Sequence, residues 1–495
     1  MIKKSSLSAL QYKKIFCENN NVKIIKDLIV GKISSGKEVG SDSYTKLNTN
    51  YRFIRTKAIQ NNNFQLDLNI EGSFEYIKPK NFEKNKGLNN KNTVNDEDLL
   101  FVTGGNVGEV VISQEIKNSI FSSHILKLPI KENKYYVFSF LKNSFCKEQA
   151  NLGPLGSIAG LDSFSIDTLL NIQIPFPNQE NKDDVIKYVE LLTQAIIDKE
   201  KEIRSKNKEI LTLIENELSK NQDIASIKLN SITFEELKKI GRLDTGMYNE
   251  KYKKVFSLIE NYKNGNSTLE DLGYKITRGQ NLQVSNIGKS IYSEDQKEGF
   301  YKLILSKYFT EFMTYNKCDY LGNPKKLKTI KKGDIIFSCR GDLGRTIVFC
   351  EDVENLITNI DNVHIENKKS SIENKIFIGC FLNYLRSIGF LTLVSITGSG
   401  ADSFTKYHFD LLKFPNFDDK KQKEIAKIYY NPIGYIKNLT LNNFLEEDKK
   451  WNKKVGIVEL DKSIKSMKTH LNSVLDKIIN NEVVKTNFNF ATYSL

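Results

Sequence analysis

The sequence has few of the residues that build metal centres, disulfide frameworks or membrane spans. Its 495 residues include six cysteines, four histidines, eight prolines and one tryptophan. No two cysteines form a Cys-x-x-Cys pair and no histidine is near them, so neither a zinc site nor a disulfide scaffold is indicated. No apolar run reaches the ~18 residues of a membrane span. The opening MIKKSSLSALQYKK lacks the apolar centre of a signal peptide. We therefore expect reduced thiols and a cytoplasmic location.

Sequence signatures of catalysis are also missing. None of the prolines is adjacent to another, so the sequence lacks the Asn/Asp/Ser-Pro-Pro-aromatic loop that holds the target amine in an amino-methyltransferase. Gly288-Lys289-Ser290 is preceded by Gln283 where a P-loop requires glycine. Residues 104–110, GGNVGEV, lie between two predicted strands without a helix to receive a phosphate, which disfavours a dinucleotide loop. We expect a non-catalytic chain without a metal or cofactor of its own.

The sequence does contain an internal repeat with a long period. Residues 96–112, DEDLLFVTGGNVGEVVI, match residues 332–348, KGDIIFSCRGDLGRTIV, in the order acidic turn, apolar strand, Gly-rich loop and strand. The matched positions, 236 apart, are Asp98 and Asp334, Phe101 and Phe337, Gly105 and Gly341, Gly108 and Gly344, and Val111 and Ile347. Further blocks repeat with offsets up to 250, such as residues 51–59 with residues 301–309. So long a period indicates a duplicated domain.

The segment after each copy has the pattern of a long helix. Residues 181–222 lack glycine and proline, and Val189, Ile196, Ile203 and Ile210 recur every seven residues, although Lys199 and Lys206 interrupt the companion row. In residues 419–485, a break near residues 432–434 precedes a second apolar seam. Its residues alternate at spacings of three and four: Ile457, Leu460, Ile464, Met467, Leu471, Val474 and Ile478. With a domain between them, the two helices can pair as an antiparallel coiled coil.

These patterns predict an α+β protein in which two similar mixed α/β domains are held apart by two long helices with pseudo-two-fold symmetry. The predicted order is domain 1–180, helix 181–222, domain 223–418, helix 419–485 and tail 486–495. The formal net charge of +13 favours a polyanionic partner. A pair of basic domains on a rigid spacer resembles proteins that read two half-sites on double-stranded DNA.

The chain resembles the specificity subunits of type I restriction–modification systems. The resemblance is carried by residues 332–348, by the helix after each domain, and by GRLDTGMYNEKY (241–252), ITGSGADSF (396–404) and IQIPFPNQ (172–179). The first domain departs from the pattern, because SSLSALQYKK stands where the second has the RLD segment.

The resemblance implies a non-catalytic DNA-binding subunit with two target recognition domains, each reading one half of a bipartite site. It implies that the helices set the spacer and dock methyltransferase subunits, and that an endonuclease/translocase subunit completes the complex. Adenine methylation would then use S-adenosylmethionine bound to the methyltransferase.

Loops between strands supply the candidate DNA contacts. Arg340 and Arg345 flank tight glycines in the second copy, and arginine suits both phosphate and bidentate guanine contacts. The first copy has Gly104 and Glu109 at these positions, which fits two domains that read different sequences. The other candidates are Thr397, Ser399, Arg278, Arg55, Lys37 and Asn106.

Two alternatives stay open at this point. The chain could be a DNA-recognition subunit of another modification or defence system, with the same domains and different partners. It could instead be a two-domain scaffold that does not bind DNA and whose positive charge is incidental.

Overall fold

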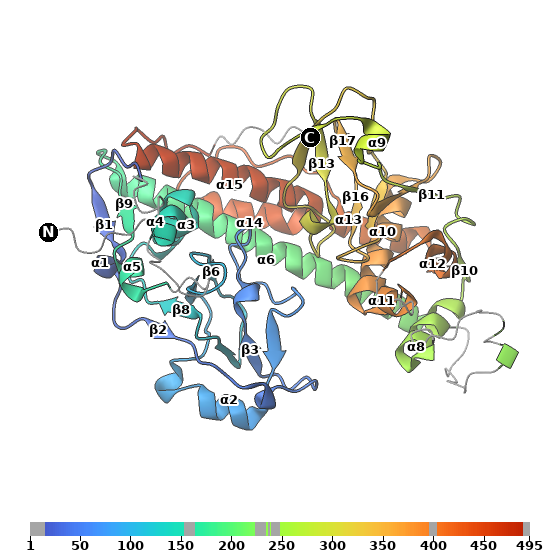
Figure 1. The fold of residues 1–495 in the computed structure, drawn as a ribbon, viewed down its shortest axis with the longest axis horizontal. Coiled ribbons are helices and arrows are strands. Elements are labelled where there is room, and N and C mark those ends of the chain that lie inside the picture. The colour runs from blue at the N-terminus through green and yellow to red at the C-terminus, as the bar shows by residue number, and fades with distance from the viewer. Residues whose placement is uncertain are drawn as a thin grey trace. The chain divides into compact units, whose positions relative to one another are not determined.

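Residues 15–152, 164–222, 234–235, 238, 248–395 and 403–488 are described by the structure, a computed structural model. The chain divides into two compact units (Figure 1). Unit 1 contains Met1–Glu202, Gly434–Lys454 and Leu460–Leu495, and unit 2 contains Ile203–Ile433 and Val455–Glu459. Each unit combines helices with short strands, so the α+β fold class is confirmed.

Unit 1 contains a four-stranded sheet in the order β2-β8-β5-β6, a three-stranded sheet in the order β4-β3-β7, and the pair β1-β9. The strands are β1 (Val22–Ile24), β2 (Ser34–Ser35), β3 (Arg52–Ile54), β4 (Phe74–Tyr76), β5 (Leu99–Val102), β6 (Val110–Ile112), β7 (Ser119–Phe121), β8 (Ile125–Leu128) and β9 (Gln173–Pro175). The shorter helices are α1 (Ile25–Leu28), η2 (Ser41–Ser43), η3 (Thr56–Ala58), α2 (Pro79–Asn85), η4 (Leu88–Asn90), α3 (Lys134–Lys142), α4 (Ser144–Leu152), α5 (Ile166–Leu170) and α14 (Phe444–Lys454).

Unit 2 contains four-stranded sheets in the orders β11-β18-β15-β16 and β12-β14-β13-β17, and the pair β10-β19. The strands are β10 (Asn266–Ser267), β11 (Lys275–Arg278), β12 (Ile291–Ser293), β13 (Tyr301–Ile304), β14 (Asp319–Gly322), β15 (Ile335–Ser338), β16 (Thr346–Val348), β17 (Leu356–Thr358), β18 (Asn362–Glu366) and β19 (Phe414–Pro415). The helices are α8 (Glu250–Glu260), α9 (Val284–Ile287), η6 (Ser306–Tyr308), α10 (Ile372–Ser387), α11 (Phe390–Ser395), α12 (Lys406–Leu411) and α13 (Asp419–Tyr429).

The strand pairs of the two units correspond in order and register. Leu100 of β5 faces Val111 of β6 and, 236 positions later, Ile336 of β15 faces Ile347 of β16. The same correspondence links β8 with β18 at an offset of 237, β2 with β11 at 243 and β3 with β13 at 250. The strand β12 corresponds to an isolated bridge in unit 1, where Tyr44 pairs with Ile77 as Tyr292 of β12 pairs with Leu321 of β14. We call residues 22–175 module 1 and residues 266–415 module 2.

The central strands of the two modules are buried for the same reason. β5 and β15 carry the apolar runs LLFV and IIFS, and all of their residues are buried. A short apolar run without alternation is typical of a strand covered on both faces. On one face, Phe101 contacts the ring of Phe164 with centroids 5.4 Å apart, and Phe337 contacts Phe404 at 5.2 Å. The second sheet of each module packs against the other face.

Two long helices, α6 (Lys182–Lys220) and α15 (Ile457–Ile479), carry the predicted apolar seams. Their portions within unit 1 lie side by side (Figure 1), where Lys468 Nζ is 2.8 Å from Glu200 Oε1 and Tyr188 Oη is 2.8 Å from His470 Nε2. All of the predicted seam residues are buried. Coiled-coil packing itself stays a prediction. Residues 419–485 form α13, α14 and α15, and the predicted break at 432–434 lies between the first two.

The lysine that interrupts the first seam is part of a buried polar cluster in unit 1. Lys199 of α6 is fully buried, and its Nζ lies 2.6 Å from Asp448 Oδ1 and 2.5 Å from Asn452 Oδ1 of α14. The ring of Trp451 lies 4.6 Å from this ammonium group, and Tyr435 donates to Asp448 at 2.7 Å. Burial lowers the pKa of Lys199, although the charge of Asp448 opposes that effect. The cluster connects α6 to α14.

Candidate nucleic-acid interface

The Gly-rich loops of the two modules have the same backbone hydrogen bonds. In the β5–β6 loop, Gly108 N donates to Val102 O at 3.0 Å, and in the β15–β16 loop Gly344 N donates to Ser338 O at 2.9 Å. Gly105 and Gly108 in the first turn, and Gly341 and Gly344 in the second, adopt positive φ, which side chains rarely tolerate. The repeated glycine spacing in the sequence therefore produces one loop shape twice.

Two further segments meet each Gly-rich loop at the same end of the four-stranded sheet. Gly36 after β2 donates its N–H to Ile125 O at 3.1 Å, and Gly279 after β11 donates to Asn362 O at 2.9 Å. A Cβ on either glycine would lie within 2.2 Å of a backbone carbonyl oxygen, so only glycine allows this approach. We call the resulting surface the loop end. It comprises residues 35–38, 103–109 and 122–124 in module 1, and residues 278–281, 339–345 and 359–361 in module 2.

The tips of the two loops carry different side chains. Arg340 in module 2 has a 54% exposed side chain, and its Nη1 lies 3.8 Å from Asp361 Oδ1. Module 1 has Gly104 and His124 at the equivalent positions, and a Cβ on Gly104 would lie 2.5 Å from His124 Nδ1. An exposed, long ion pair contributes about 1 kcal/mol or less, so Arg340 can leave Asp361 for a phosphate or a base at little cost.

The other predicted arginines are engaged within their own domains. Arg345 has a 15% exposed side chain, Arg278 contacts the turn before β18, and Arg55 lies between β3 and η3 of module 1. Their partners are Glu311 for Arg345 (2.9 Å), the carbonyl oxygens of Ile360 and Phe404 for Arg278 (3.3 and 3.1 Å), and Glu75 for Arg55 (3.1 Å). Their roles as DNA contacts stay predictions.

The structure brings some of the predicted residues together at the loop ends. Lys37 and Asn106 are exposed on module 1, while Arg278 and Arg340 share the loop end of module 2. Thr397 and Ser399 lie outside the described residues. The sequence interpretation missed His124 and Asp361, although they lie directly before β8 and β18, which match at an offset of 237 residues. Extending the alignment through the next strand would have found them.

Module 2 contains a buried histidine where module 1 has a lysine ion pair. Lys127 Nζ lies 3.2 Å from Asp98 Oδ2. At the equivalent positions, His364 Nδ1 lies 3.9 Å from Asp334 Oδ2 and also 3.9 Å from Glu366 Oε1. Neither ring nitrogen of His364 has a hydrogen-bond partner in the described part of the chain. Burial lowers the pKa of His364 to about 4.

Replacing His364 with glutamine is expected to flatten the pH dependence of stability on the acid side. The unfolded histidine takes up a proton below about pH 6.5, whereas the folded one stays neutral until about pH 4. Stability of the wild type should therefore fall with decreasing pH in this window, by about 1.4 kcal/mol per pH unit relative to His364→Gln. Urea unfolding at several pH values measures this. His124→Gln, at an exposed histidine, is the matched control, and parallel pH profiles for wild type and His364→Gln would contradict the assignment.

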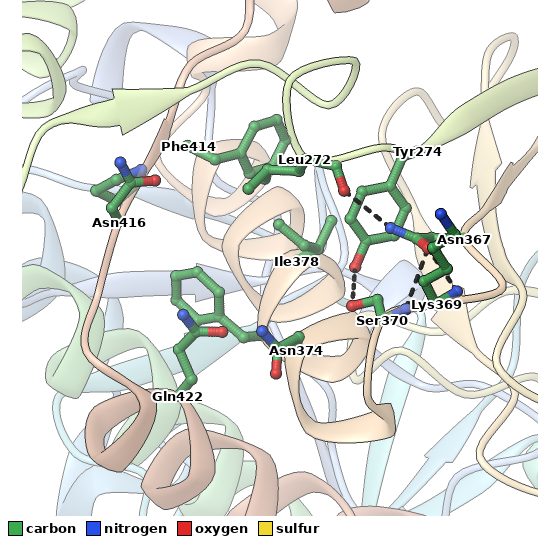
Figure 2. Close-up of a pocket in the computed structure, with 12 residues that line it drawn as sticks. Leu272, Tyr274, Asn367, Lys369, Ser370, Asn374, Ile378, Phe414, Asn416 and Gln422 are labelled. Carbon is green, nitrogen blue, oxygen red and sulfur yellow. Dashed lines mark hydrogen bonds between the residues drawn. The ribbon is translucent and has the colours of Figure 1, made fainter.

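Unit 2 contains a pocket of about 260 Å³ (Figure 2). Phe414 and Ile378 form its apolar wall, and several of its polar groups are bonded internally. The bonds are Tyr274 to Ser370 (3.2 Å), Asn367 to Leu272 O (2.9 Å), Asn416 to Asn264 O (3.2 Å) and Gln422 to Phe417 O (2.7 Å). Asn416 follows β19 as Phe176 follows β9 in module 1.

Within the part of the chain that the structure describes, no helix is long and apolar enough to cross a bilayer. Among the same residues, no group of three or more His, Cys, Asp and Glu side chains could hold a metal ion.

The fold and the loop ends define a two-module α+β protein that presents an equivalent surface twice. Solved structures similar to this chain include the type I restriction–modification S subunit from M. genitalium, at 14% identity and a TM-score of 0.39 over 94% of this chain and 98% of that one. The HsdS subunit from Thermoanaerobacter tengcongensis matches at 12% identity and a TM-score of 0.27 over 93% and 97%. A chain from a structure of the type I R-M system matches at 12% identity and a TM-score of 0.28, over 93% of this chain and 98% of that one.

No family model matches the chain, and no curated protein matches its sequence. The similar structures bear the family name that the sequence motifs indicated.

Proposed function

We propose that this chain is the DNA-recognition subunit of a restriction–modification complex, with each module reading one part of a bipartite site. The supporting observation is that the two modules have matched strand registers but carry different side chains at equivalent positions of their loop ends. Module 2 has Arg340 and Asp361 where module 1 has Gly104 and His124. Phosphate contacts position a protein on DNA, whereas side chains at the base edges determine sequence, so a constant frame with variable tips suits two different half-sites.

In this proposal the chain is non-catalytic. Helices α6 and α15 set the distance between the half-sites and dock the methyltransferase subunits, which bind S-adenosylmethionine and methylate adenine. An endonuclease/translocase subunit completes the complex. The net charge of +13 supports binding to the phosphate backbone of double-stranded DNA.

Methylome sequencing tests the proposal. A strain that carries this gene with its methyltransferase should methylate a split motif that disappears when the gene is deleted. Exchanging residues 231–415 for another recognition domain should change one half of that motif and leave the other half intact. The deletion strain complemented with the unaltered gene is the control.

Two outcomes would contradict the proposal. An unchanged methylome after deletion would exclude a role in methylation, even if the purified chain binds DNA. A change in both halves of the motif after the exchange would exclude independent reading by the two modules.

A further inference from the structure

The base of each Gly-rich loop carries a charged residue, and the sign of the charge is reversed between the modules. Glu109 in module 1 and Arg345 in module 2 both directly follow the last glycine of the loop. Each accepts the same backbone hydrogen bond at its carbonyl oxygen, from Val102 N and from Ser338 N, at 2.8 Å in both cases. The two residues are therefore equivalent in backbone position and opposite in charge.

In module 2 the charged residue of the loop is held by an acid. Arg345 Nη2 lies 2.9 Å from Glu311 Oε1, and the same guanidinium donates to Phe309 O. Arg386 of α10 donates to both oxygens of Glu311, one of them at 3.2 Å. The side chains of Arg345, Glu311 and Arg386 are 15%, 16% and 22% exposed. One acid between two arginines thus ties the loop to a helix.

In module 1 the charged residue of the loop is held by a cation. Lys147 of α4 donates to both oxygens of Glu109, at 3.0 and 3.1 Å, and also to Asn61 Oδ1. The Glu109 side chain is 13% exposed. Beneath it, Lys142 of α3 donates to three backbone carbonyl oxygens and adds a second cation 3.9 Å from Glu109.

The partners of the two charged residues come from corresponding places in the modules. Asn61 and Glu311 are related by the 250-residue offset of β3 and β13, and each follows the short 3-10 helix after that strand. Lys147 and Arg386 both come from the helical segment that follows the four-stranded sheet. We call each of these three-residue networks a tie. Its members are the charged residue of the Gly-rich loop, the residue that follows the 3-10 helix, and a residue of the later helical segment. They are acid, amide and lysine in module 1, and arginine, acid and arginine in module 2.

We propose that Glu109 and Arg345 are positioning residues, which fix the base of each loop so that the tip side chains, such as Arg340, meet DNA. This inference rests on the proposed function. A partly buried ionic network loses more stability when one member is removed than an exposed pair does, because a charge is left desolvated without its partner. It follows that the loop of one module cannot be grafted into the other alone, since Glu109 would then face Glu311.

A charge-exchange experiment tests the tie. Arg345→Glu places two acids beside Arg386, whereas Arg345→Glu with Glu311→Asn reproduces the module 1 set, with Arg386 in the role of Lys147. The readout is hydrogen exchange of the Gly344 amide, which bonds to Ser338 O. In Arg345→Glu the Gly344 amide should exchange about tenfold faster than in the wild type. The double variant should recover most of the protection, because neighbouring residues are energetically coupled. A double variant as unprotected as Arg345→Glu would overturn the tie.

DNA binding by the complex with its methyltransferase separates a positioning role from direct contact. The double variant should recover the affinity for the methylated motif that Arg345→Glu loses, while Arg340→Ala should lose affinity with full protection at Gly344. If the double variant recovers protection without affinity, Arg345 itself contacts DNA and the positioning role is wrong. Absence of DNA binding by the wild type would overturn the proposed function. Hydrogen exchange at Gly344 would still show whether Arg345 and Glu311 hold the base of the loop.

Discussion

Replacing Asp448 with alanine is expected to lower the free energy of unfolding by about 3–5 kcal/mol, because it leaves a buried ammonium group without its counter-charge. Lys199 is fully buried, and Asp448 supplies the anionic oxygen 2.6 Å from its Nζ. Trp451, the one tryptophan of the chain, lies against this ammonium group, so its fluorescence reports directly on the cluster during urea unfolding.

The matched control removes both charges together. Lys199→Met with Asp448→Leu is expected to recover most of the lost stability, because well-packed apolar side chains can replace a buried ion pair at no net cost. A loss of less than about 1 kcal/mol in Asp448→Ala would be typical of an exposed pair and would contradict the burial of the cluster.

This cluster marks a limit of sequence interpretation. The seven-residue pattern identified a long helix and showed Lys199 as an interruption of its apolar row. Its partner is 249 positions away, in a helix that carries no long apolar seam. Periodicity reports which face of a helix is apolar, but it holds no information on which distant residue neutralises a buried charge.

The duplication was the part of the fold most open to prediction. Matched blocks in the sequence predicted two copies of one domain, and in the structure the sheets β2-β8-β5-β6 and β11-β18-β15-β16 have the same strand order. The reversed ties could not be found in the same way. Glu109 and Arg345 align at an offset of 236, whereas Asn61 and Glu311 align at 250, so no single alignment block holds both members. The difference between Glu109 and Arg345, read from the sequence as divergence in DNA reading, has a second physical explanation in these ties.

Replacing Gly279 with alanine is expected to destabilise unit 2 by about 3 kcal/mol, at the upper end of the usual cost of overpacking. A Cβ on Gly279 would lie 2.1 Å from Asn359 O, a backbone atom that cannot move away as a flexible side chain can. The backbone would have to shift at the point where β11, the turn before β18 and the Gly-rich loop meet. Urea unfolding measures the loss, and the same shift should weaken DNA binding through module 2.

Two further glycine variants give this prediction its controls. Gly434→Ala has no atom within 4 Å of the added Cβ and should be neutral or slightly stabilising, since it restricts the unfolded chain. Gly36→Ala should cost as much as Gly279→Ala, because its Cβ would meet Phe121 O at 2.2 Å at the equivalent position of module 1. Equal costs at the two sites would follow from one backbone arrangement built twice. If alanine is tolerated at Gly36 or Gly279, the backbone at that site does not approach the neighbouring carbonyl oxygen as closely as the equivalent backbone does in the other module.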